Sequence, residues 1–144
     1  MKRFDFGLAL LPLVLATGCV IGTVRGKQAE LCSNLATLNR AIAALNQIAS
    51  ISTSPVDALR QAEERVSQAY REFRNTAKDD AQEAKDADLE KAYKNLEKAY
   101  EDLDKKVKDL PDKSTMAQAR AVISENLTTT ESALVQVKSS LRCQ

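Results

Sequence analysis

Three cysteines, Cys19, Cys32 and Cys143, are the residues of this chain whose chemistry is most informative. Cys19 ends an apolar leader, whereas Cys32 and Cys143 stand near the start and at the end of a helix-forming body. The simplest assignment is a disulfide between Cys32 and Cys143, which leaves Cys19 for a different modification. Since the chain has no Cys-x-x-Cys spacing, we expect this bridge to be structural rather than redox-active.

The chain offers few groups for catalysis or metal binding. It contains no histidine, which excludes Ser–His and Cys–His nucleophile pairs and His-bearing zinc sites. Five acidic residues gather in one short segment, but they lack the central glycine and the ligand spacing of a calcium loop. We therefore expect a solvated turn there, no enzymatic activity, and no cofactor or metal. The acidic residues are Asp79, Asp80, Glu83, Asp86 and Asp88.

Residues 1–18 have the layout of a signal peptide. Lys2 and Arg3 form a short positive region, and residues 7–16 are apolar apart from the interruption at Pro12. This apolar run is shorter than the roughly 20 helical residues that span a bilayer core. The pattern favours a leader that is cleaved.

The end of the leader, Ala16-Thr17-Gly18-Cys19, resembles the lipobox of bacterial lipoproteins, with Ala16 where leucine usually stands. The resemblance implies that Cys19 receives a diacylglycerol anchor with acyl chains such as palmitate. It also implies that residues 19–26 form a lipidated tether on the bacterial cell envelope, at the periplasmic face of a membrane or at the cell surface. The alternative is ordinary secretory cleavage near Ala16 or Gly18. That would leave a free thiol beside a disulfide pair, which is a liability in an oxidising compartment.

The remaining body, residues 27–144, is expected to form one domain with balanced charge. The whole chain carries 21 Lys and Arg against 20 Asp and Glu. Because there is no basic stripe, we expect no nucleic acid as a partner. Charge also gives no reason for docking on anionic lipid, so membrane attachment would depend on the acyl chains.

Apolar residues recur at intervals of three and four along the body and predict an all-α fold. All four glycines precede residue 27, and only Pro55 and Pro111 interrupt the rest of the chain. Ser54-Pro55 is typical of a helix start, and Thr115 to Gln118 form a predicted capping box. The four apolar stripes are Leu31, Leu35, Leu38, Ile42, Leu45 and Ala49; Val56, Leu59, Val66, Tyr70, Phe73 and Ala77; Leu89, Tyr93, Leu96, Tyr100, Leu103, Val107 and Leu110; and Met116, Ile123, Leu127, Thr130, Leu134, Val137 and Leu141.

Residues 55–110 could form one long helix or two, because no Gly or Pro interrupts them after Pro55. The second and third stripes differ in phase, and the segment 78–88 has only alanines to bury, which predicts a turn near residue 82. A disulfide needs Cα atoms within about 7 Å, so the first and last helices must meet at one end, as in an even number of antiparallel helices. We therefore predict an antiparallel up-down-up-down four-helix bundle with heptad-like packing. The alternative is three helices with a long central helix or coiled coil.

Two features of the predicted third helix allow more than one interpretation. Leucines at sevens, from Leu89 to Leu110, could form a dimerising zipper. We favour the core of the bundle, because the other stripes must also be buried. With a turn near residue 82, Tyr70 and Tyr93 are expected to lie at the same level and pack together.

The overall pattern resembles small helical-bundle envelope lipoproteins of no assigned activity, and it contributes no functional residues. We expect a lipid-anchored, non-enzymatic interaction or scaffold module that binds another envelope protein. The alternative is a carrier for an apolar ligand or lipid held between the helices. The first is preferred because an alanine-rich interior leaves little room for a cavity; the choice of membrane and the oligomeric state stay open. The alanines are Ala41, Ala43, Ala44, Ala62, Ala69, Ala92 and Ala99.

Overall fold

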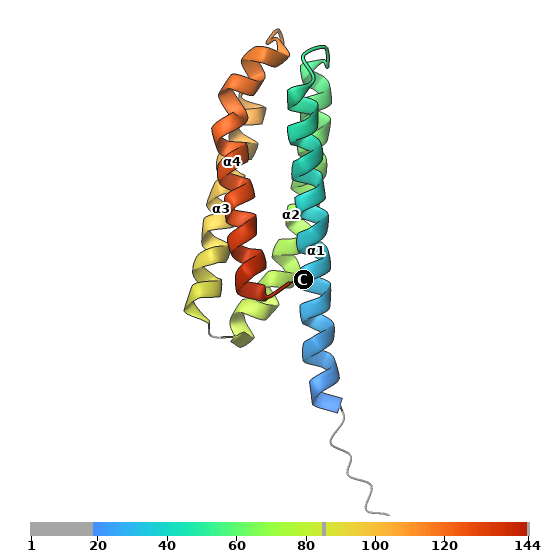
Figure 1. Cartoon of the computed structure of the whole chain (residues 1–144), viewed down its shortest axis with the longest axis vertical. Coiled ribbons are helices and arrows are strands. Elements are labelled where there is room, and N and C mark those ends of the chain that lie inside the picture. Colours follow the sequence, from blue (N-terminus) through green and yellow to red (C-terminus); the bar gives the residue numbers. More distant parts are fainter. Residues whose placement is uncertain (1–18, 85, 144) are drawn as a thin grey trace, which may run out of the picture.

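The protein is a bundle of four helices. The structure, a computed structural model, describes the backbone of residues 19–84 and 86–143 and the side chains of residues 26–80 and 86–143. The helices are α1 (Cys19–Ser50), α2 (Val56–Ala84), α3 (Ala87–Lys108) and α4 (Met116–Leu141). Chain neighbours run antiparallel (Figure 1), and α1 also packs against α4, which closes the bundle. The predicted all-α four-helix bundle is confirmed, and the three-helix alternative is wrong.

Helix α1 begins at Cys19, earlier than the predicted start near residue 27. The segment 19–26, expected as a tether, has a helical backbone. Gly22 and Gly26 each destabilise a helix by about 1 kcal/mol relative to alanine. Extending an existing helix, however, gains one hydrogen bond for each residue added. The first turns of α1 project beyond the end of the bundle (Figure 1). The predicted signal peptide, residues 1–18, lies outside the described residues.

Helices α2 and α3 are separate, as the phase difference between their stripes predicted. The break falls between Ala84 and Ala87, inside the predicted segment but later than residue 82. Asp86 is the N-cap of α3, and its carboxylate accepts hydrogen bonds from the backbone N–H groups of Asp88 and Leu89 at 3.0 and 3.2 Å. One member of the acidic segment thus caps a helix, which satisfies two of its unpaired backbone donors.

The later turn changes which aromatic side chains meet. Tyr70 stacks on Tyr100 with ring centroids 4.0 Å apart, and Tyr93 packs edge-on against Phe73 at 5.8 Å. The predicted contact between Tyr70 and Tyr93 is therefore wrong. When the turn lies near residue 85 instead of 82, each residue of α2 faces a residue further along α3. The residue opposite Tyr70 therefore shifts by about two helical turns, from Tyr93 to Tyr100.

The apolar stripes form one core. Every predicted stripe residue is buried except Tyr93, which is half-buried. The heptad leucines from Leu89 to Leu110 are buried inside the chain, which leaves them no surface for a dimerising zipper. Two of the alanines assigned to the interior, Ala43 and Ala44, are exposed instead. Both lie on the outer side of α1. This side has few charged residues, so its sequence resembles that of a helix side that packs in the core.

The predicted start of the last helix is also confirmed. Thr115 and Gln118 form a capping box in which the Gln118 backbone N–H donates to the Thr115 hydroxyl at 3.3 Å. The Thr115 backbone N–H donates in return to the Gln118 side chain at 3.0 Å. Two unpaired donors of the helix end are satisfied by one residue pair, and this fixes where α4 begins.

Candidate binding groove beside the disulfide

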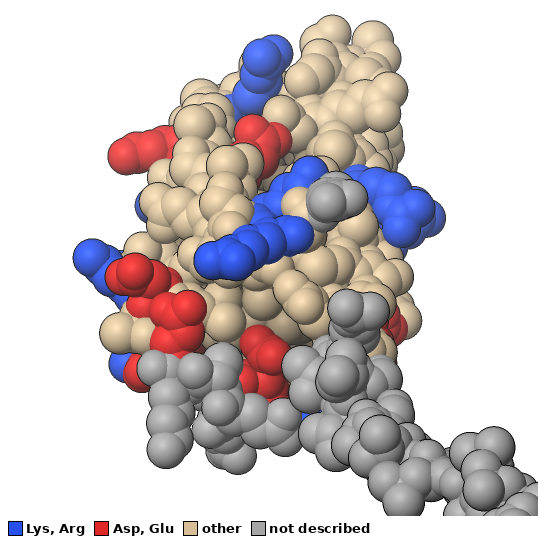
Figure 2. Space-filling view, turned by 60° about the horizontal axis from the view of Figure 1, so that its bottom comes forward, with Lys and Arg blue, Asp and Glu red and all other residues tan. Residues whose placement is uncertain are grey.

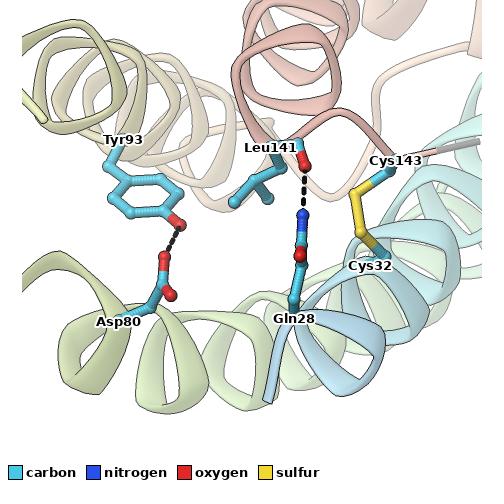
Figure 3. Close-up of a disulfide and its surroundings, with 6 residues drawn as sticks. All are labelled: Gln28, Cys32, Asp80, Tyr93, Leu141 and Cys143. Carbon is cyan, nitrogen blue, oxygen red and sulfur yellow. Dashed lines mark hydrogen bonds between the residues drawn. A yellow bond between two sulfur atoms is a disulfide. The ribbon is translucent and has the colours of Figure 1, made fainter. Parts of the chain in front are cut away.

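The structure forms the disulfide between Cys32 and Cys143, with Cα atoms 5.6 Å apart. Arg142, the C-cap of α4, has a left-handed backbone with φ of 55°, and this turns the chain end away from the helix axis toward α1. One turn before Cys32, the Gln28 side chain donates a hydrogen bond to the carbonyl of Leu141 at 2.9 Å (Figure 3). Two links of different chemistry therefore fasten the end of α4 to α1.

Cys19, the third site residue predicted from the sequence, is the first residue of α1. The side chain of Cys19 is not among those that the structure describes. The structure therefore gives the position of Cys19 in the chain and does not test its modification. The structure brings Cys32 and Cys143 together and leaves Cys19 at the far end of the projecting turns (Figure 1).

A groove of about 590 Å³ lies between α1 and α4 beside this disulfide. Since Cys32 is the first groove residue on α1 and Cys143 the last one after α4, the disulfide crosses one end of the groove. Its floor is apolar, because Leu35 and Leu134 are each only 3% exposed. The lining residues are Cys32, Leu35, Ala36, Asn39, Arg40, Leu134, Val135, Lys138 and Cys143.

Two cations line this groove, one from each helix. Arg40 donates only to its own helix, to the Ala36 carbonyl at 3.4 Å and the Thr37 hydroxyl at 3.3 Å. Neither Arg40 nor Lys138 has an acidic partner among the described residues. Two uncompensated cations in a partly enclosed, apolar groove create a positive potential there.

Several cations on the other half of the bundle form ion pairs, whereas others, such as Arg71 and Lys98, have none among the described residues. Arg74 of α2 pairs with Glu97 of α3 at 2.7 Å, and within α3 Lys94 pairs with Glu90 at 2.6 Å. Figure 2, which brings the lower end of the bundle forward, shows Lys and Arg side chains across the middle of that end, with acidic side chains above and below them. Unpaired cations are therefore not confined to the groove, and what distinguishes it is that two of them, from different helices, line one apolar floor.

A second, smaller groove of about 250 Å³ lies between α2 and α3. Tyr70, Phe73 and Tyr93 line it, and its rim carries the paired residues Arg74 and Glu97. Burial, with Asp80 nearby, raises the pKa of the Tyr93 hydroxyl, which stays protonated and donates to Asp80 at 3.2 Å (Figure 3). The aromatic rings contact one another, and four of the five charged lining residues form ion pairs within the described part of the chain, Lys78 being the exception. This groove therefore has fewer unpaired polar groups to offer a ligand.

A buried carboxyl group, Glu63, lies beside the partly exposed Asp104 between the same two helices. Glu63 of α2 is 4% exposed, and one of its oxygens has no hydrogen-bond partner. Burial, and then the hydrogen bond and charge of Asp104, raise the pKa of Glu63 to about 7, while Lys108 opposes the shift. This pair was not predicted from the sequence, although Glu63 occupies the stripe position between Leu59 and Val66, which is the signal that would have revealed it.

Comparisons with family models, with curated proteins and with solved structures found no match to this chain. Within the described residues, no helix is both long and apolar enough to cross a membrane. The described residues also contain no group of three or more His, Cys, Asp or Glu residues that could hold a metal ion. Function must therefore be inferred from the chain's own surfaces and charges.

Proposed function

We propose that this protein is a lipid-anchored, non-enzymatic interaction module of the bacterial cell envelope. Its binding surface is the α1/α4 face, which we define as the exposed side chains of these two helices near their shared seam. The observation that carries the proposal is the difference in charge between the two halves of the bundle. The face comprises Ala36, Arg40, Ala43, Gln47, Ala121, Ser124, Thr128 and Val135.

The outer surfaces of α1 and α4 carry fewer charged side chains than those of α2 and α3. Between Lys27 and Ser50, α1 carries only Lys27, Glu30 and Arg40. The four charged residues of α4 are Arg120, Glu125, Glu131 and Lys138. Helices α2 and α3, by contrast, carry charged side chains along most of their exposed length. Charged residues are depleted at the centres of protein interfaces, so the α1/α4 half is the one suited to a protein partner.

Exposed apolar side chains support the same assignment. In the described part of the chain, the large hydrophobic residues that are exposed are Ile51, Val122 and Val135, at 46%, 46% and 63%. Of these, Val135 of α4 lies on the α1/α4 face, whereas Val122 of α4 and Ile51, which follows α1 directly, are outside the face as defined above. Exposed apolar area of this kind is a common mark of interaction sites.

The lipid anchor is the second part of the proposal and is supported by the lipobox-like sequence that ends at Cys19. Replacing Cys19 by alanine should release the protein from membranes or leave its leader uncut, because no acyl chain can then be attached at that position. Fractionation of cells and gel mobility measure both effects. A variant that fractionates and migrates like the wild type would show that Cys19 carries no anchor.

Site-specific photocrosslinking in intact cells tests the binding surface. A photoreactive residue at Ala43 of α1 or Thr128 of α4 should give a discrete protein adduct, because both side chains are exposed on the α1/α4 face. The matched controls are Gln61 of α2 and Lys98 of α3, which are also exposed but lie on the charged half. Adducts from the control positions alone, or from none of the four, would contradict the proposal.

A carrier that holds its ligand inside the bundle is less well supported. Ala62, Ala69, Ala92 and Ala99 are all buried at 3–5% exposure, which lets the helices approach closely around the core. The grooves described above are open to solvent. A ligand of this protein would therefore lie on its surface rather than among the core side chains.

A further inference from the structure

We propose that the groove beside the disulfide binds a single-chain anionic amphiphile of the fatty-acid class. The carboxylate would lie against Arg40 and Lys138, and the hydrocarbon chain would lie over Leu35, Leu134 and Val135. The groove shares Ala36, Arg40 and Val135 with the α1/α4 face, so a bound amphiphile would occupy part of that face and would add a small-molecule ligand to the protein.

The size and lining of the groove suit such a ligand. Its volume of about 590 Å³ falls within the range of about 300–1,000 Å³ that is typical of small-molecule sites. Those sites are mostly apolar with a few polar groups that orient the ligand. Leu35 and Leu134 provide an apolar floor, and Val135, at 63% exposure, is an apolar wall that a hydrocarbon chain would remove from water.

The positive charges of the lining residues favour a ligand with a negatively charged head group. Arg40 and Lys138 enter the groove from different helices, and neither has a carboxylate partner among the described residues. A bound carboxylate would supply the missing negative charge to both, and a guanidinium can hold it with two parallel hydrogen bonds. The amide of Asn39, also in the lining, is a further donor.

The groove is fixed in shape before any ligand arrives. The Cys32–Cys143 disulfide and the hydrogen bond from Gln28 to Leu141 hold α4 against α1 at this end (Figure 3). A site that is already formed loses less conformational freedom on binding. The disulfide also crosses one end of the groove, which favours a short ligand over a partner helix that would have to continue past that end.

Isothermal titration of the chain from residue 19 onward, with the disulfide formed, tests this assignment. The probe is dodecanoate below its micellar concentration. We expect one dodecanoate per chain, at least tenfold weaker binding of dodecyltrimethylammonium, which has the same chain with a cationic head, and no detectable binding of acetate. The variants Arg40→Gln and Lys138→Gln should each weaken dodecanoate binding about tenfold, the effect of losing one charge-assisted contact.

The matched control is Arg71→Gln, an exposed arginine of α2 outside the groove, which should leave dodecanoate binding unchanged. Since Arg40 and Lys138 are exposed, thermal unfolding should show that their variants fold normally. Equal binding of the anionic and cationic amphiphiles, or unchanged affinity in both groove variants, would overturn the proposal. Preference for dodecyl phosphate over dodecanoate would overturn the fatty-acid assignment, as would binding of an acidic peptide in the absence of dodecanoate binding.

Discussion

The folded protein should lose about 2 to 3 kcal/mol of stability as the pH rises from 5 to 8, because Glu63 must ionise in a buried position. The pKa of Glu63 is about 7 in the folded protein, against an ordinary value of 4.5. Between these two values the folded state retains a proton that the unfolded chain has released. The free energy of unfolding therefore falls as the pH rises through this window and levels off above it.

Urea unfolding at several pH values between 5 and 8 measures this slope. Glu63→Gln should flatten it and raise stability at pH 8, because a neutral amide of similar volume needs no ionisation and can still donate to Asp104. Glu72→Gln is the matched control, since Glu72 is an exposed carboxylate of the same helix that is not among the groups acting on Glu63, and its replacement should preserve the slope. Asp104, Lys108, Glu64 and Tyr100 interact with Glu63 and are left unchanged. A Glu63→Gln protein with the wild-type slope would show that this carboxyl is not responsible.

Reduction of the disulfide should cost up to about 4 to 5 kcal/mol of unfolding free energy, because closing so long a loop removes much of the conformational entropy of the unfolded chain. Cys32 and Cys143 are 111 residues apart. The double variant Cys32→Ala/Cys143→Ala should lose a similar amount. Chemical denaturation with and without reductant measures the difference.

The double variant is also the control for the reductant, which should have no further effect on it. Thiol titration gives an independent result. The protein made in an oxidising compartment should show no reactive thiol at Cys32 or Cys143 when denatured without reductant. Two reactive thiols, or equal stability before and after reduction, would contradict the bridge.

Much of the fold was predictable because helix burial is a local property of the sequence. Leu96 and Leu103, both 0% exposed, follow from apolar spacing alone, since residues three and four apart share one face. The register between helices is not local, because it depends on the exact residue at which the chain turns. Asp86, followed by Ala87, Asp88 and Leu89, is an N-cap signal that would have placed the turn more accurately than the middle of the polar segment.

The candidate site was predictable only in part. Counting cysteines identified the Cys32–Cys143 pair, because disulfide pairing can be argued from the number and placement of thiols. The groove itself depends on which helices lie side by side and on the outward direction of Arg40 and Lys138. Glu63 was missed for a related reason, since a glutamate at a core position becomes informative only when its burial and its partner Asp104 are known.

The position of the disulfide also determines how mechanical tension would pass through the molecule. Cys32 lies near the first packed turn of α1, and Cys143 follows α4, so the covalent bond closes nearly the whole bundle into a loop. A pull on the two chain ends is transmitted from Cys32 to Cys143 through the sulfur atoms rather than through the helices. Only residues outside this loop, including the projecting first turns of α1 (Figure 1), can then be stretched. The core is thereby shielded from any force applied at the termini.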